Sequence, residues 1–341
     1  MNLQILWFIL WGVLWAAYFM LDGFDLGAGI LYGVLGRTPA ERAAIRKTLG
    51  PVWDGNEVWL ITAGGATFAA FPAVYASMFS FLYSALLLVL FALIFRGAAL
   101  EFRAKSDGAA WAKMWDASIT IASLLLALLF GVAFGNIFRG LPVDAQGYHG
   151  TFFSLLNPYG LLTGLLFVLM FTVHGALWVG LKTEGELSRR ALRTAGSLWY
   201  GEAGAAAAFL AATYFGTGLA ANYLKHPIWL IVPVLAAAFL GGVKWGVGRA
   251  KAGFAFAASS AAIVLVTLTG IIGLFPNLIP SRLDPAASLT AFNSSSSPYT
   301  LKIMTVVALV FVPIVIAYQV WIYRVFRRRT PILESPDSHD Y

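Results

Sequence analysis

Apolar runs of about 20 residues recur along the whole chain, separated by short charged or Pro/Gly-rich breaks. A helix of about 20 apolar residues is what crosses a hydrocarbon core about 30 Å thick. Of the 341 residues, 60% are hydrophobic and only 11% are charged, against about 25% charged in an average soluble domain. A soluble fold cannot bury this much apolar surface. The sequence therefore predicts an all-α, polytopic transmembrane protein.

The breaks between the runs predict nine transmembrane helices. Their expected positions are 4–30, 53–74, 77–97, 115–136, 156–181, 197–220, 228–247, 253–275 and 301–323. The second run is the least regular, because Asp54, Glu57, two glycines and Pro72 interrupt it. The first run has no basic segment or small-residue cleavage site before it, so we expect a retained helix and not a signal peptide.

The distribution of Lys and Arg predicts the orientation, because cytoplasmic loops are enriched in both. An outside N-terminus and a cytoplasmic C-terminus place 19 of the 23 basic residues on the inner side. The outer side keeps Arg139, Lys225, Arg282 and Lys302. This asymmetry accounts for the net charge of +7, so the sequence gives no reason to expect a nucleic-acid partner.

Two outer connections, 137–155 and 276–300, are long and polar. We expect them to form small ordered caps or partner contacts. The cytoplasmic tail, 325–341, carries two prolines and several acids after Arg329, and that part is expected to be disordered.

The first predicted helix ends with two carboxylates beside two glycines. Asp22 and Asp25 are three residues apart and so share one helical face. Gly23 and Gly27 have the GxxxG spacing that lets another helix backbone approach closely. The pattern predicts a packed polar interface.

The second predicted helix opens with the segment WDGNEVW. Asp54 lies at the helix N-terminus, where capping and the helix dipole favour a carboxylate. Trp53 and Trp59 suit an aromatic belt at the membrane surface. A helix cap with aromatic anchors is a sufficient explanation for Asp54 taken alone.

The predicted topology places six acids at the cytoplasmic side of the first four helices, with Arg96 nearby. They are Asp22, Asp25, Asp54, Glu57, Glu101 and Asp116. Ionisable groups at membrane depth are costly, so they are candidates for function. A series of carboxylates leading inward could take up protons through bridging water. Solvated helix ends with an Arg96 ion pair explain the same pattern, and spacing does not decide between the two.

The chain has four histidines, His149, His174, His226 and His339, of which only His174 lies within a predicted helix. An intramembrane haem takes axial ligands such as histidine or methionine, and several haems need several of them. A lone His174 is better explained as a hydrogen-bonded core residue. The sequence therefore predicts no metal or haem held by this chain alone.

Five segments resemble subunit II of the cytochrome bd quinol oxidases. They are LDGFDLGAGIL at 21–31, GPVWDGNEVWLITAGGATFAAFPAVYASMFS at 50–80, FRGAALEFRAKS at 95–106, GVAFGNIFRG at 131–140 and NPYGLL at 157–162. Weaker similarity continues to the last predicted helix. The DGFDLG and WDGNEVWLITAGG segments together are highly specific.

The resemblance implies a fold of two four-helix bundles, 1–136 and 156–275, and a peripheral ninth helix at 301–324. It implies a prokaryotic inner-membrane heterodimer with a subunit I that carries haems b and d, oxidises quinol and reduces dioxygen to water. This chain would bind no haem and supply no catalytic residue.

The resemblance also implies residue roles. Asp54 and Glu101 are the main candidates for a proton route, although some members have aspartate where this chain has Glu101, so the carboxyl reaches further. A structural quinone and a small single-helix accessory subunit occur in this context, and the sequence does not decide whether either is present.

Two other functions remain open at the level of sequence. Asp22, Asp25 and Asp54 would suit proton coupling in a secondary transporter with broken helices. The chain would also suit a purely structural scaffold subunit, in which the acids make only packing contacts.

Overall fold

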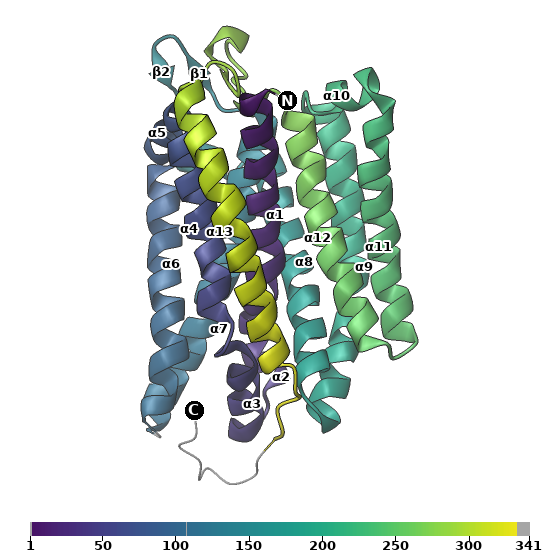
Figure 1. Cartoon of the computed structure of the whole chain (residues 1–341). Coiled ribbons are helices and arrows are strands. Elements are labelled where there is room, and N and C mark those ends of the chain that lie inside the picture. The colour runs from purple at the N-terminus through teal and green to yellow at the C-terminus, as the bar shows by residue number, and fades with distance from the viewer. Residues whose placement is uncertain (1, 107, 333–341) are drawn as a thin grey trace.

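The computed structural model describes residues 2–106 and 108–332. Most of this part of the chain is helical (Figure 1). The α-helices are α1 (Leu3–Ile30), α2 (Tyr32–Leu35), α3 (Pro39–Leu49), α4 (Trp53–Ala70), α5 (Pro72–Phe81), α6 (Tyr83–Phe102), α7 (Ala109–Arg139), α8 (Pro158–Lys182), α9 (Gly185–Gly216), α10 (Ala220–Lys225), α11 (Ile231–Gly248), α12 (Ala252–Leu274) and α13 (Pro298–Val325). The 3₁₀ helices are η1 (Arg103–Lys105), η2 (Phe153–Leu155), η3 (Pro227–Leu230) and η4 (Pro285–Ala287), and the strands are β1 (Val143–Asp144), β2 (Gly147–Tyr148), β3 (Asn277–Ile279) and β4 (Leu289–Thr290).

Seven helices of the described segments are long and apolar enough to cross a membrane. They are α1, α6 with η1, α7, α8, η3 with α11, α12 and α13. The helices α4 and α5 reach this standard only together, as a pair bent by 120°, which would make eight. The 32-residue helix α9 runs beside α8 and α11 in Figure 1 but is more polar. The multi-pass character is confirmed, whereas the count of nine crossings stays a prediction.

The predicted boundary between the helices at 53–74 and 77–97 is wrong. Helix α4 ends at Ala70, α5 begins at Pro72, and the next long helix begins only at Tyr83. Proline has no backbone N–H and restricts the residue before it, so a helix cannot continue unchanged through Pro72. Phe71 accordingly has non-helical dihedrals, φ −136° and ψ 65°. The apolar run continues past this position, which is why hydropathy alone missed the bend.

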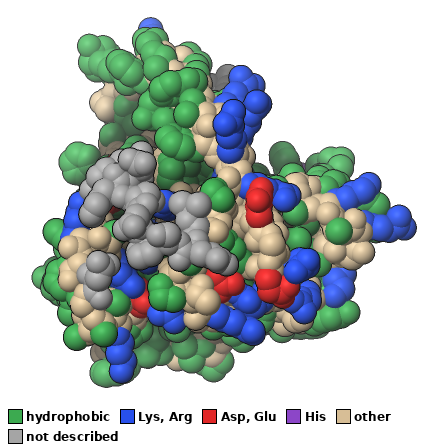
Figure 2. All heavy atoms as spheres, turned by 90° about the horizontal axis from the view of Figure 1, so that it is seen from below, with side chains coloured by type: hydrophobic (Ala, Val, Ile, Leu, Met, Phe, Trp, Pro, Cys, Tyr) green, Lys and Arg blue, Asp and Glu red, His purple; other side chains and the backbone are tan. Residues whose placement is uncertain are grey.

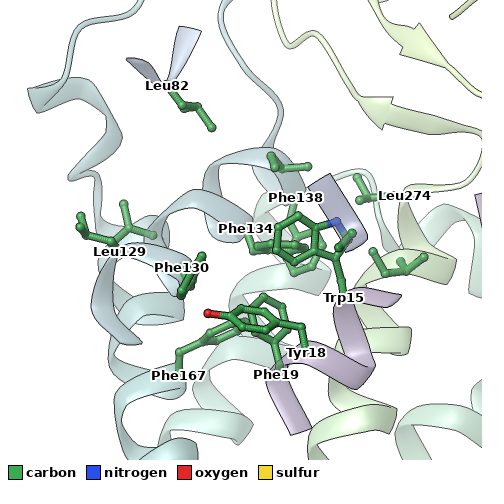
Figure 3. Close-up of a cluster of buried hydrophobic side chains, with 14 of the residues drawn as sticks. Trp15, Tyr18, Phe19, Leu82, Leu129, Phe130, Phe134, Phe138, Phe167 and Leu274 are labelled. Carbon is green, nitrogen blue, oxygen red and sulfur yellow. The ribbon is translucent and has the colours of Figure 1, made fainter. Parts of the chain in front are cut away.

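Helix α1 lies at the centre of the molecule and packs against α4, α7, α8, α12 and α13. Its aromatic side chains build the core with those of α7 and α8 (Figure 3). Phe19 meets Phe134 and Phe167 edge to face, with ring centroids 5.1 and 5.0 Å apart. Such edge-to-face pairs stabilise a core by about 0.5–1.5 kcal/mol each beyond their buried area. The aromatic core therefore packs α7 and α8 against α1.

The backbones of α1 and α8 approach closely at glycines. A Cβ added at Gly27 would lie 1.7 Å from the carbonyl oxygen of Phe171, and one at Gly175 would lie 2.1 Å from the Ala28 nitrogen. A Cβ at Gly23 would lie 2.8 Å from the Phe171 ring. No side chain larger than hydrogen fits at Gly27 without moving α8.

The two long polar connections form small caps at the end of the molecule that carries the N-terminus (Figure 1). Each contains a two-stranded antiparallel hairpin, β1 with β2 and β3 with β4. Leu141 joins them, because its N–H donates to the Pro280 carbonyl and its own carbonyl accepts from the Arg282 N–H. These hairpins are additions to the predicted all-α fold.

The opposite end carries α2, α3, η1 and the end of α13, and we call it the basic end (Figure 1). Figure 2 shows this end, where Lys and Arg side chains outnumber Asp and Glu. The segment after α13 returns to α8, because the Thr330 N–H donates to the Lys182 carbonyl. Most of the tail that was predicted to be disordered, 333–341, lies outside the described residues.

Candidate functional site

A buried ion network joins three helices near the basic end. The side chain of Arg96, on α6, is 1% exposed and forms two ion pairs. One joins Nη2 to Oδ1 of Asp22, on α1, at 3.0 Å, and the other joins Nη1 to Oε1 of Glu57, on α4, at 2.6 Å. The Tyr18 hydroxyl donates to the other Asp22 oxygen at 3.1 Å. The guanidinium thus holds two carboxylates from different helices.

Asp25 lies one turn further along α1 and belongs to a second set of contacts. Its Oδ2 accepts from the Asn56 amide at 2.6 Å, while its Oδ1 has no partner among the described residues. The Asn56 oxygen accepts from Gln319 and from the Tyr323 hydroxyl, each at 2.9 Å. Asn56 therefore connects a buried carboxylate on α1 with the last helix, α13.

Asp116 lies in a separate cluster and does not join Arg96. Its two oxygens accept from Arg42 Nη1 and Arg103 Nε, both at 2.7 Å. These bases come from α3 and η1. Asp116 thus lies at the same end as Arg96 but pairs with two other arginines. The position of Asp116 in the sequence indicated the end of the molecule at which it lies, but not the residues to which it bonds.

Asp54 and Glu101 are exposed, and the described residues give neither one a hydrogen bond or ion pair. Asp54 lies in the first turn of α4, but Val52 is the N-cap residue and no side chain caps the helix. The cap suggested for Asp54 is therefore wrong. Asp54 and Glu57 are three positions apart in the sequence, so both lie near one face of α4. Glu57 is itself 20% exposed and lies between this surface and Arg96.

The two tryptophans of α4 have different surroundings. Trp53 is half-buried and lies over Gly97, whereas Trp59 is 8% exposed and belongs to the hydrophobic core. Six residues at about 100° each place the two side chains on different faces of the helix. The suggestion of a membrane-surface belt is therefore wrong for Trp59.

His174 is fully buried in α8. Its Nε2 donates to the Met20 carbonyl at 3.1 Å, and its ring stacks on Phe256 with centroids 4.5 Å apart. These contacts fix the ring between α1 and Phe256, while its Nδ1 has no partner among the described residues. In the described part of the chain, no group of three or more His, Cys, Asp or Glu could hold a metal ion.

Several residues of the network escaped the sequence analysis. They are Tyr18 and Asn56, which bind Asp22 and Asp25, and Gln319 and Tyr323, which bind Asn56. Glu202 on α9 also escaped the sequence analysis, and its buried Oε2 has no partner among the described residues. A polar residue inside an apolar run was the available indication for Glu202 and Gln319. Nothing in the sequence pairs Asn56 with residues more than 260 positions away.

A partly buried ion pair at the basic end links α3 to α9. Oε1 of Glu41 accepts from Arg190 Nη2 at 2.6 Å, and its Oε2 accepts from the Arg37 N–H at 2.8 Å. Partial burial opposes ionisation of Glu41, but these donors outweigh it and lower the pKa of Glu41 below its usual value of 4.5.

The fold and the network define a polytopic helical membrane protein with ion pairs buried between its helices. The sequence family described as cytochrome bd terminal oxidase subunit II matches residues 3–326. The chain therefore belongs to the cytochrome bd terminal oxidase subunit II family, and the resemblance found in its sequence is confirmed.

Individual relatives agree. The chain is 39% identical over 329 residues to the cytochrome bd ubiquinol oxidase subunit 2 of Bacillus subtilis, covering 96% of this chain and 97% of that one. It is 37% identical over 365 residues to the cytochrome bd-I ubiquinol oxidase subunit 2 of Escherichia coli K12, covering 96% and 95%. A chain of the bd oxidase from Geobacillus thermodenitrificans has the same fold, with a TM-score of 0.78, 18% identity and coverage of 96% and 99%.

Proposed function

We propose that this chain is the haem-free subunit of a terminal oxidase that couples quinol oxidation to the reduction of dioxygen to water. The family match over residues 3–326 carries the proposal, and curated relatives are named as ubiquinol oxidase subunits. A haem-bearing subunit I is the partner, in a prokaryotic inner membrane. Subunit I performs the redox chemistry, while this chain supports assembly and proton supply.

The proposal includes an orientation and a count. Nine crossings result if the bent pair α4 and α5 counts once and α9 is included. The basic end is then cytoplasmic, because Lys and Arg concentrate there (Figure 2). The hairpins and the N-terminus face outward.

We further propose that protons enter at Asp54 and Glu101 and pass to the buried network. Asp54 is exposed at the basic end and lies near the face of α4 that carries Glu57. Glu57 in turn contacts Arg96, which contacts Asp22. Arginine keeps its proton in proteins, so carboxylates carry the protons and Arg96 holds them in position.

The charge balance of the network supports this role. Asp22 and Glu57 share the guanidinium of Arg96, and Asp25, one turn from Asp22, has only the neutral Asn56 amide among the described residues. A second uncompensated negative charge at membrane depth is costly, so the network favours binding at least one proton. Asp25 has an oxygen without a partner among the described residues, and that oxygen can carry the proton.

The proton route is tested with Asp54→Asn and Glu101→Gln in the assembled complex. Quinol-dependent oxygen consumption is expected to slow while the haem absorption spectrum persists, because only proton delivery is changed. Glu184→Gln is the matched control, since Glu184 is another exposed acid at the basic end. Unchanged turnover in both test variants would leave the scaffold function as the better explanation.

The oxidase function itself is tested by removing the chain. Membranes that lack it are expected to lose the quinol-dependent oxygen consumption of this oxidase, and expression of the intact chain is expected to restore it. Full activity of subunit I without this chain would contradict the proposal.

A further inference from the structure

A cavity of about 250 Å³ opens at the basic end among α3, the turn before α4, α8 and the end of α13. Three basic residues line it, Lys47 of α3, Lys182 of α8 and Arg328 beyond α13. Among the residues that the structure describes, no Asp or Glu belongs to its lining. The rest of the wall is largely apolar and includes Trp178 and Val52. The cavity therefore combines concentrated positive charge with an apolar side.

None of these three bases has an acidic partner among the described residues. Arg42, Arg103 and Arg190 at the same end each pair with a carboxylate. Within the described ranges, neither Lys47 nor Arg328 forms an ion pair, and both are exposed. Lys182 is 8% exposed, and its ammonium donates to the Phe326 carbonyl, which fixes its position in the wall.

We propose that this cavity binds a phosphate group, either the headgroup of an anionic phospholipid or a free phosphate ion. An ammonium or guanidinium group donates strongly to phosphate oxygens, and Lys and Arg are the usual residues for this task. A basic pocket between membrane helices is a recognised kind of site for anionic headgroups. The apolar wall would accommodate the glycerol and the first methylenes of a lipid.

A phosphate group at this place would add to the two hydrogen bonds that join Lys182 to Phe326 and Thr330. Among the long helices, α13 packs mainly against α1 and α4, and its Tyr323 ring meets Trp178 of α8 with centroids 6.0 Å apart. Lys182 belongs to α8, Lys47 to α3 and Arg328 to the segment after α13. A ligand held by all three bases would fasten the end of α13 to the rest of the molecule.

The test uses the purified complex in nanodiscs of phosphatidylcholine with a minority of phosphatidylglycerol. After release into mild detergent, native mass spectrometry counts the phospholipids that each complex retains. The test variant is Lys47→Gln with Arg328→Gln, because both side chains are exposed and the packed Lys182 stays in place. Lys113→Gln with Lys251→Gln is the control, since these bases lie at the same end but outside the cavity. An unchanged haem spectrum shows that each variant is folded.

The wild type and the control are expected to retain phosphatidylglycerol in preference to phosphatidylcholine. Retention should weaken about fivefold for each base removed in the test variant. Displacement of the lipid by millimolar inorganic phosphate, but not by chloride at equal ionic strength, would identify a free phosphate ion as a ligand of the same site. Equal retention of both lipids by the wild type, or equal phosphatidylglycerol retention by all three proteins, would overturn the proposal.

Discussion

Replacing Arg96 tests the buried network most severely. Arg96→Gln removes the positive charge from a side chain that is 1% exposed and breaks its ion pairs with Asp22 and Glu57. Asp22, with a fully buried side chain, would then keep only the Tyr18 hydroxyl. Leaving a buried charge without its partner costs about 3–5 kcal/mol. We expect the free energy of unfolding to fall by about that amount.

The assay is equilibrium unfolding of the complex by sodium dodecyl sulfate titration in mixed micelles. The control is Arg189→Gln, which breaks a solvent-exposed pair with Glu186 and should leave stability nearly unchanged. A triple variant with Arg96→Met, Asp22→Asn and Glu57→Gln removes the charges together and should recover most of the loss. If Arg96→Gln unfolds like the control, the network does not hold buried charges as the structure indicates.

Three further predictions concern other parts of the chain. Gly27→Ala should lower the yield of assembled complex and destabilise it by about 1–3 kcal/mol, because the added Cβ collides with the backbone of α8. Gly33→Ala is the control: its added Cβ meets no atom within 4 Å, so this variant should assemble normally, as measured by size-exclusion chromatography. The pKa of Glu41 is lower in the folded state than its usual 4.5, so ionised Glu41 stabilises the fold above pH 4.5, and this stabilisation is lost as the pH falls through the folded-state pKa. The difference in melting temperature between wild type and Glu41→Gln should therefore shrink as the pH is lowered below 4.5. Glu202→Met should stabilise the protein by about 1–3 kcal/mol in the same detergent titration, because it removes a buried oxygen that has no partner among the described residues. A loss of stability would show that Glu202 has a partner that the described residues do not include.

The sequence was sufficient for the elements that depend on one continuous apolar run. The helix predicted at 4–30 is α1, Leu3–Ile30, because no charged residue or proline interrupts the run between Gln4 and Asp22. The helix predicted at 253–275 is α12, Ala252–Leu274. The prediction at 197–220 was poorer, because α9 begins at Gly185 in a charged segment that hydropathy excludes. Helical turns made of charged residues extend α9 beyond its apolar run, and a hydropathy pattern does not detect them.

The candidate site was only partly predictable for a different reason. The cost of ionisable groups at membrane depth identified Asp22, Asp25, Glu57 and Arg96 correctly as buried or partly buried. Their pairing depends on which helices lie side by side, and Arg96 is 74 residues from Asp22. The sequence could not show that Asp116 has its own pair of arginines or that α13 reaches Asn56. Those contacts follow from tertiary packing.

The most direct test of the oxidase assignment is purification of this chain through an affinity tag in mild detergent, followed by a visible absorption spectrum and identification of the chains that accompany it. We predict haem absorption bands and a second large membrane subunit in equal amount with this chain. A colourless protein without that partner, under conditions that preserve such complexes, would contradict the assignment and make proton-coupled transport the function to test.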